Sequence, residues 1–463
     1  MSDVTTVVNP ATEMAIAELP LAGADEVDAA VARSLESGRH WRSVAPADRA
    51  RLMRRFAAEV EEHAEELARL ETSNVGKPIT ESRDEVAMVA EVLYFYAGAV
   101  DKHRGATVPV AGGVDMTFHE PLGVVAAIVP WNFPIAITSW KIGPALATGN
   151  TIVVKPAEIT PLSALRLAEL ALDAGMPEGV FQVVVGKGSI VGTRLVGHPD
   201  VAKVAFTGST EVGREVMARA SGTIKRVTLE LGGKSASVIF ADADLERAAA
   251  ATPGGVFANA GQDCCARSRV LVERSVFDRY LSLLADALPG WTVGDPTDPT
   301  TKMGPLVTAA HRRVVESFLA PGMGGPGGGP VDAFAVGAVP DGPGYWFPPT
   351  VVAPAEPAWR LVREEIFGPI VAVIPFEDEA DAVRLANDTP YGLSGSIWTR
   401  DGARALRMAR AISSGNLSVN SHSSVRVQTS FGGMKQSGFG RELGLEALAS
   451  YTDVKNVFVS TDG

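Results

Sequence analysis

The chain has 463 residues and a formal net charge of −12 at neutral pH. This length exceeds what one ordinary hydrophobic core organises, so it predicts two or three domains. Hydrophobic residues make up 46% of the sequence and charged residues 21%, a composition typical of a globular protein in water. The acidic balance argues against nucleic acid as a partner, because a general polyanion binder needs a basic surface.

The sequence also indicates the compartment. It contains no run of about 18 uncharged apolar residues, so no transmembrane helix is expected. The first ten residues lack the basic region and apolar core of a signal peptide. The only two cysteines, Cys264 and Cys265, are neighbours, and neighbouring cysteines rarely form a disulfide. Together these features predict a cytoplasmic protein that binds no membrane.

The first hundred residues predict helices. Apolar residues recur at spacings of three and four over 25–35, over 47–70 and over 81–100. An extended stretch follows at 114–119, and we expect it to pair as a hairpin.

From residue 124 the pattern changes to alternating strands and helices. Continuous apolar runs, typical of strands buried on both faces, occupy 123–130, 151–156, 180–186 and 201–208. Helical segments at 161–174 and 210–220 separate them. This βαβ alternation predicts a doubly wound parallel sheet.

A second α/β block follows Gly233. Its predicted strands are 235–240, 269–273, 370–375, 395–398 and 416–419. A segment rich in Gly and Pro at 321–330 predicts a loop. The tail at 451–460 reads as a strand, and we expect it to pair with another subunit or another domain, because an unpaired terminal edge invites aggregation.

Two segments carry the chemistry. Cys264 follows a Gly-Gln-Asp turn, and Glu230 lies in the apolar run Leu229-Glu-Leu-Gly-Gly-Lys-Ser. A thiol can attack a carbonyl carbon, and a carboxylate whose pKa is raised by burial can later activate water. The pair therefore predicts covalent acyl chemistry.

A possible phosphate site follows the strand that ends at Phe206. In Phe206-Thr-Gly-Ser-Thr-Glu-Val-Gly, Gly208 and Gly213 bracket Ser209 and Thr210 at the start of a helix. Free backbone N–H groups at such a helix start can hold a phosphate. The spacing departs from the Gly-x-Gly-x-x-Gly fingerprint, so a simple capped helix explains the motif equally well.

Two further loops follow predicted strands. Lys155 and Glu158 lie where ligands bind in open parallel sheets, and they can hydrogen-bond the hydroxyls of an adenine ribose. A carboxylate there would repel a 2′-phosphate, which favours NAD over NADP. In Pro130-Trp-Asn-Phe-Pro the two prolines fix the direction of Asn132, whose amide can stabilise an oxyanion. For an isolated asparagine an Asx turn is the commoner explanation.

Seven motifs together resemble the NAD(P)-dependent aldehyde dehydrogenase superfamily, and they occur in its order over nearly the whole chain. They are Pro130-Trp-Asn-Phe-Pro, Lys155-Pro-Ala-Glu, Phe206-Thr-Gly-Ser-Thr-Glu-Val-Gly, Leu229-Glu-Leu-Gly-Gly-Lys-Ser, Gly261-Gln-Asp-Cys, Glu364-Glu-Ile-Phe-Gly-Pro and Phe431-Gly-Gly-Met-Lys-Gln-Ser-Gly. One departure is Ala236, where the family commonly has Pro. It lies in the strand after the Glu230 motif, where we expect little effect.

The resemblance implies an α/β aldehyde dehydrogenase-like fold. Its parts would be a Rossmann-like parallel-sheet NAD-binding domain (1–107 and 122–233), an α/β catalytic domain (234–430) and a β-strand oligomerisation arm with the tail (108–121 and 431–463). Relatives assemble as dimers or dimers of dimers, so a homodimer or homotetramer is expected.

The resemblance also implies residue roles. Cys264 would be the nucleophile, Glu230 the general base and Asn132 the oxyanion donor, with Lys141 and Glu442 on a proton path from the base. The implied cofactor-binding residues are Pro130, Trp131, Lys155, Glu158, Gly188, Gly208, Ser209, Gly213, Leu231, Gly232, Glu365 and Phe367. No metal is expected, because the seven histidines form no ligand-spaced cluster. Cys265 is best explained as a small buried hydrophobe.

The implied reaction is oxidation of an aldehyde to the carboxylic acid with NAD. Water is the expected acyl acceptor, because coenzyme A-dependent relatives lack the base at Glu230. Two stretches, 259–264 and 394–401, resemble bacterial aminobutyraldehyde and betaine aldehyde dehydrogenases, which suggests an aminoaldehyde or semialdehyde. Trp131, Phe257 and Trp398 can form an aromatic box for a cationic amine, although each is equally explained as core. Simple aliphatic or aromatic aldehydes are the alternative substrates.

Two other classes compete with this interpretation. A thiol hydrolase would usually need a histidine beside Cys264, and none lies near it in sequence. A catalytically silent family member is also conceivable, although it would have no need to keep Asn132, Glu230 and Cys264 together.

Overall fold

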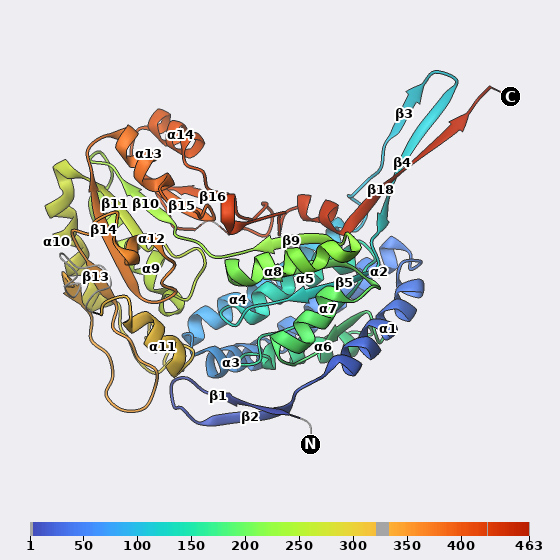
Figure 1. The fold of residues 1–463 in the computed structure, drawn as a ribbon, viewed down its shortest axis with the longest axis horizontal. Helices are drawn as coiled ribbons and strands as arrows, with labels where there is room; N and C mark the ends of the chain where they lie inside the picture. The colour runs from blue at the N-terminus through green and yellow to red at the C-terminus, as the bar shows by residue number, and fades with distance from the viewer. Residues whose placement is uncertain (1–2, 321–332, 424, 463) are drawn as a thin grey trace.

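The computed structural model describes residues 3–320, 333–423 and 425–462. Two sheets with their covering helices lie side by side, and a three-stranded arm projects away from them (Figure 1). The loop predicted at 321–330 lies outside the described residues. Within the described ranges, no helix has both the length and the apolar character needed to cross a membrane.

The first sheet has six strands in the order β17-β9-β8-β5-β6-β7, and β17 alone runs antiparallel to its neighbour. Its strands are β5 (Val124–Ile128), β6 (Thr151–Lys155), β7 (Phe181–Val183), β8 (Val201–Thr207), β9 (Arg226–Glu230) and β17 (Gly438–Phe439). The four strands predicted between 123 and 208 are therefore confirmed as neighbours in one parallel sheet.

Helices cover both faces of this sheet. One face packs on α2 (Pro46–Glu62), α4 (Ile79–Ala99), α5 (Pro134–Ala147) and α6 (Leu162–Asp173), and the other on α1 (Ala24–Trp41), α7 (Thr193–Gly197) and α8 (Thr210–Ala220). Alternate residues of β5 serve the two cores: Val125 and Ala127 join the first, and Val124 and Ala126 join the second. Because both faces are buried, each strand is apolar throughout, as the doubly wound prediction requires.

One predicted helix is two helices. The segment 47–70 divides into α2 and α3 (Ala64–Val75), with His63 at φ −99° and ψ 18° between them. The apolar face continues through the break, from Val60 to Leu67, because both helices pack on the same core. The periodicity of the sequence therefore does not reveal the turn at His63.

The second sheet has seven strands in the order β12-β13-β14-β11-β10-β15-β16, parallel except for β12. They are β10 (Ala236–Ile239), β11 (Arg269–Glu273), β12 (Ala335–Val336), β13 (Thr350–Val352), β14 (Ile370–Phe376), β15 (Ser394–Trp398) and β16 (Asn416–Val419). The helices are α9 (Leu245–Phe257), α10 (Phe277–Ala287), α11 (Ala309–Glu316), α12 (Arg360–Arg363), α13 (Glu379–Asn387) and α14 (Gly402–Ala411). All five strands predicted for this block are present.

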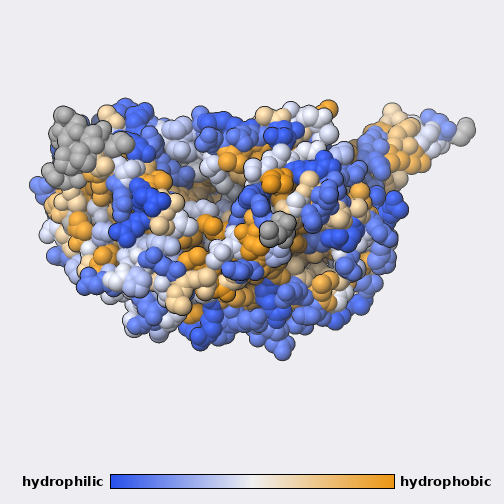
Figure 2. All heavy atoms as spheres, turned by 60° about the horizontal axis from the view of Figure 1, so that its bottom comes forward, coloured by the Kyte–Doolittle hydropathy of each residue, from blue (hydrophilic) through white to orange (hydrophobic). Residues whose placement is uncertain are grey.

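The arm consists of β3 (Thr107–Val110), β4 (Gly113–Pro121) and the terminal strand β18 (Thr452–Ser460). β18 runs antiparallel to β4, from Thr452 opposite Pro121 to Ser460 opposite Gly113, so the tail pairs with the predicted hairpin of its own chain. Apolar side chains stay exposed on the arm (Figure 2), among them Phe118, Val454 and Phe458. A second hairpin, β1 (Val4–Val8) and β2 (Ala15–Pro20), lies near the N-terminus. The domain limits stay a prediction; β17, within 431–463, pairs with the first sheet.

Candidate active site

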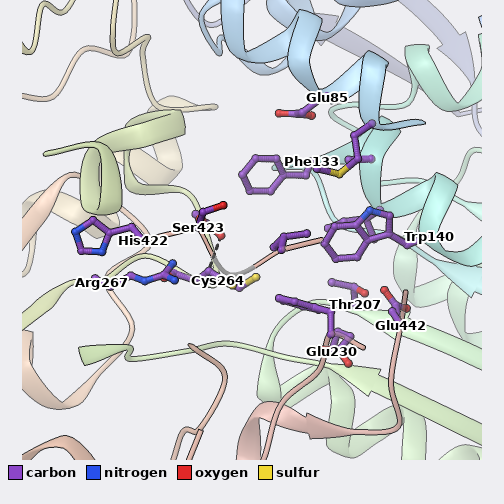
Figure 3. Close-up of a pocket in the computed structure, with 17 residues that line it drawn as sticks. Glu85, Phe133, Trp140, Thr207, Glu230, Cys264, Arg267, His422, Ser423 and Glu442 are labelled. Atoms are coloured by element: carbon purple, nitrogen blue, oxygen red, sulfur yellow. Dashed lines mark hydrogen bonds between the residues drawn. The ribbon is translucent and has the colours of Figure 1, made fainter. Parts of the chain in front are cut away.

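Two cavities meet at Cys264. The first has a volume of about 330 Å³ and the second about 240 Å³, and both are lined by Ile137, Thr207, Glu230 and Cys264. Figure 3 shows the first cavity, with Glu230, Thr207 and Glu442 grouped on one side of Cys264 and Arg267 and His422 on the other. The Cys264 thiol and the Glu230 carboxyl group, which are predicted to act one after the other, therefore both border the two cavities.

Cys264 lies on a loop that follows α9. The backbone before it is left-handed at three successive residues, with φ of 47° at Asn259, 55° at Ala260 and 70° at Gly261. A side chain at Gly261 would put its Cβ 2.4 Å from the carbonyl of Gly368, so only glycine permits this close packing. A hydrogen bond with Cys265 and burial raise the pKa of the Cys264 thiol well above its usual value.

Asn132 lies in the turn between β5 and α5 and is buried. Its Nδ2 donates to the carbonyl oxygen of Gln262 at 2.9 Å, which ties it to the Cys264 loop rather than to a local Asx turn. An amide group has two hydrogens, so one stays available for a developing oxyanion.

Glu230 ends β9 and is 4% exposed. Among the described residues neither of its carboxyl oxygens has a hydrogen-bond partner. Burial, and then the negative charge of Glu442, raise the pKa of Glu230 well above its usual value. The backbone of Gly432 approaches so closely that a Cβ there would lie 2.8 Å from Oε1. A buried carboxyl group without a hydrogen-bond partner can bind a water molecule and take a proton from it.

A buried polar network adjoins Glu230. The ammonium group of Lys141 donates to Thr207 Oγ1 at 2.8 Å and to the carboxylate of Glu442. Lys141 and Glu442 are almost inaccessible to solvent, and their charges act in opposite directions on the pKa of Glu230. The structure thus brings the predicted proton-path residues together with Glu230.

The second cavity contains most of the predicted cofactor residues. Pro130, Trp131, Gly208, Ser209, Leu231, Gly232, Glu365 and Phe367 line it, beside Asn132. Glu365 accepts a hydrogen bond from the Gly233 N–H at 2.8 Å, and burial raises the pKa of Glu365 to about 7. A Cβ at Gly232 would lie 2.2 Å from the Glu365 carboxylate, so a side chain there would displace that carboxylate.

A third cavity, of about 280 Å³, lies along α8. Its lining includes Gly188, Phe206 and Val212, and the Gly188 N–H donates to Glu158 at 3.0 Å. Ser209, just before α8, lines the second cavity and Val212, in its first turn, lines the third, so both cavities border the helix N-terminus, which suits a dinucleotide with its pyrophosphate there. The residues present therefore fit NAD.

Three predicted cofactor residues lie outside the walls of these cavities. Lys155 is buried and donates to the carbonyl oxygen of Pro156 at 3.0 Å, and burial lowers its pKa. Glu158 reaches the third cavity only through Gly188. Gly213 packs against Leu231: a Cβ added at Gly213 would lie 2.6 Å from Cδ2 of Leu231.

The predicted aromatic box is wrong. Phe257 and Trp398 are buried in the core of the second sheet, and Trp131 lines the second cavity, so the three rings do not surround one space. The first cavity instead has the rings of Phe133, Trp140 and Phe431 in its wall, with Trp140 and Phe431 edge to face at 5.2 Å. Tertiary packing decided which aromatic side chains became core.

Several residues of the first cavity have no signal in the sequence. Glu85 comes from α4, and its carboxylate accepts from Lys77 at 2.7 Å. His422 comes from the loop after β16, and burial lowers its pKa to about 3. Asp263 could have been found, because it directly precedes Cys264; its carboxylate accepts from the Cys265 N–H at 2.8 Å.

Comparisons with known proteins show the family of the chain. Residues 2–457 match the model of the aldehyde dehydrogenase family. The chain is 42% identical to the NADP/NAD-dependent aldehyde dehydrogenase PuuC of Escherichia coli strain K12 (98% of this chain, 92% of PuuC) and 38% identical to betaine aldehyde dehydrogenase of Bacillus subtilis strain 168 (99% and 94%). The crystal structure of PnpE with nicotinamide adenine dinucleotide is 42% identical, with a TM-score of 0.96 (100% of this chain, 95% of that one); PnpE comes from Pseudomonas sp. WBC-3.

The chain therefore belongs to the aldehyde dehydrogenase family. Its fold is the fold of that family, and its reaction is the NAD(P)-linked oxidation of an aldehyde.

Proposed function

We propose that the protein oxidises an aldehyde to the free carboxylic acid with NAD, through a thioester on Cys264. One observation carries the proposal: Cys264 and Glu230 line both the first and the second cavity, and the Glu230 carboxyl group has no hydrogen-bond partner among the described residues. The substrate would enter the first cavity, and the nicotinamide would lie in the second. Trp131, Glu365 and Phe367 would hold it there.

The chain's own residues account for the steps. Cys264 loses its proton to solvent water, and its sulfur bonds to the aldehyde carbon, which leaves an oxyanion beside the Asn132 amide and the Cys264 N–H. Bound NAD supplies the hydride acceptor. Loss of hydride from the thiohemiacetal carbon leaves a thioester on Cys264. Glu230 then takes a proton from water, the resulting hydroxide attacks the thioester carbon, and the acid departs as the thiol reforms.

The acyl acceptor we propose is water, because Glu230 lines the same two cavities as Cys264 and its carboxyl oxygens have no hydrogen-bond partner among the described residues. We propose NAD over NADP because the Glu158 carboxylate stands at the edge of the third cavity, where it would repel a 2′-phosphate. No observation favours a thiol hydrolase: His422, the histidine of the first cavity, places Nδ1 3.2 Å from Ser396 Oγ.

The substrate we propose is an aldehyde that carries an amino group. Asp263 contributes a carboxyl group to the first cavity, whereas that of Glu85 is already paired with Lys77, and the rings of Phe133 and Trp140 lie in the same wall. Carboxylates and aromatic faces both attract an ammonium group. The family includes betaine aldehyde dehydrogenase, whose named substrate is also cationic. A broad aliphatic or aromatic aldehyde dehydrogenase stays the second candidate, because much of the wall is apolar.

A panel of aldehydes tests this function. We expect NADH and free acid from NAD, a lower KM for NAD than for NADP, and a higher kcat/KM for an ω-aminoaldehyde than for the neutral aldehyde of equal length. Asp263→Asn should reduce that preference by about tenfold, because it removes a charge-assisted contact. The ratio of the two substrates in each protein is its own control. An acyl-coenzyme A product, or an unchanged ratio, would contradict the corresponding part of the proposal.

We also propose that the arm joins copies of the chain into a homodimer or homotetramer. Its exposed side chains Phe118, Val454 and Phe458 are apolar on a protein with net charge −12, and an apolar strand face of this kind usually has a partner. Light scattering should give two or four times the chain mass of 48.5 kDa. Val454→Asp with Phe458→Asp should lower that mass, whereas Val4→Asp, an exposed valine outside the arm, should not.

A further inference from the structure

A half-buried carboxyl group from α4 reaches the loop that carries Cys264. Glu81 Oε2 accepts a hydrogen bond from the backbone N–H of Asn259 at 3.1 Å. Glu81 belongs to a helix on the first sheet, and Asn259 belongs to the turn after α9, beside the second sheet. The contact therefore joins the two α/β blocks at the turn that begins the Cys264 loop.

Asn259 also contacts Asn132, the predicted oxyanion donor. Its side-chain Nδ2 donates to the carbonyl oxygen of Asn132 at 2.9 Å, and Asn132 in turn donates from its own Nδ2 to Gln262 at 2.9 Å. Gln262 closes the network by donating from Nε2 to the carbonyl oxygen of Asn259 at 3.0 Å. Asn132 and the Cys264 loop are thus held relative to each other by two buried residues, Asn259 and Gln262.

The turn that contains Asn259 needs such a contact. Asn259 and Ala260 both have positive φ, a conformation that residues with a side chain rarely adopt, so the surrounding structure must hold them there. The N–H of Asn259 would otherwise be a buried donor without a partner, which is unfavourable. Glu81 supplies its acceptor.

We propose that Glu81 is a positioning residue for catalysis: through Asn259 it holds the Asn132 amide and the Cys264 loop in the arrangement that stabilises the oxyanion. The proposal rests on the roles proposed above for Asn132 and Cys264. Glu81 itself touches neither cavity, so it is no substrate or cofactor ligand.

Two substitutions separate positioning from simple loss of charge. Burial raises the pKa of Glu81 to about 7, so a neutral group is already common at this position near neutral pH. Glu81→Gln keeps an acceptor oxygen and should retain kcat within a few-fold. Glu81→Ala removes the acceptor and should lower kcat by about ten- to a hundredfold, since small misplacements of reacting groups have effects of this size. The KM values for aldehyde and NAD should change little in both variants.

Asp84→Asn is the matched control, because it removes an exposed carboxylate from the same helix. The NADH burst in rapid mixing supplies a second readout: Glu81→Ala should slow the burst, because poorer oxyanion stabilisation slows the addition of Cys264 to the aldehyde, which precedes hydride release. Equal kcat losses in the Gln and Ala variants, or a rise in KM alone, would overturn the proposal. So would an unchanged burst rate. A failure of the proposed function is recognised separately, because the wild-type protein would then make no NADH.

Discussion

Replacing Cys264 with alanine is expected to abolish NADH formation from every aldehyde. The sulfur that bonds to the aldehyde carbon would be absent, and loss of a nucleophile typically lowers kcat by roughly a thousandfold or more. Because Cys264 is one of several residues lining the second cavity, NAD should still bind. The measurement is the absorbance of NADH under saturating aldehyde, with NAD binding followed by quenching of tryptophan fluorescence.

Cys265→Ala is the matched control for this prediction. Cys265 is also a cysteine of the loop, but it is buried against the core of the first sheet. Its truncation should leave most of the activity. If Cys264→Ala kept its turnover while Cys265→Ala lost it, the nucleophile would have been assigned to the wrong thiol.

Replacing Glu230 with glutamine should separate the two halves of the reaction. The amide has nearly the same shape but cannot take a proton from water, so steady-state turnover should fall by about 10²- to 10⁴-fold. The thioester forms before water attacks, so rapid mixing should show a burst of NADH close to one equivalent per active subunit. Stopped-flow absorbance measures both quantities in one experiment.

The size of the burst decides what Glu230 does. A full burst followed by slow turnover agrees with a base that acts on water. Loss of the burst would instead assign Glu230 to the activation of Cys264, because the first NADH would then also require it. Asp242→Asn, which changes a carboxylate hydrogen-bonded to Thr399 and absent from the walls of both cavities, should behave as the wild-type protein does.

The sequence by itself determined which segments form the two sheets. Strands such as β5 and β6 are apolar at every position because both of their faces are buried, and that pattern is visible without coordinates. It also located Cys264, Glu230 and Asn132, because each lies in a short motif at the end of a predicted element. Catalytic residues that lie in short local motifs can be recognised from the sequence alone.

Only the tertiary structure decided what surrounds those residues. Phe257 and Trp398 became core while Phe133 and Trp140 line the first cavity, although all four are large and aromatic. Glu81 reaches Asn259 across 178 positions of sequence. Contacts of this kind depend on how α4 packs against the Cys264 loop, and packing between distant segments leaves no period or motif in the sequence. The shape and charge of the cavity, and with them the choice of substrate, are therefore properties of the folded chain.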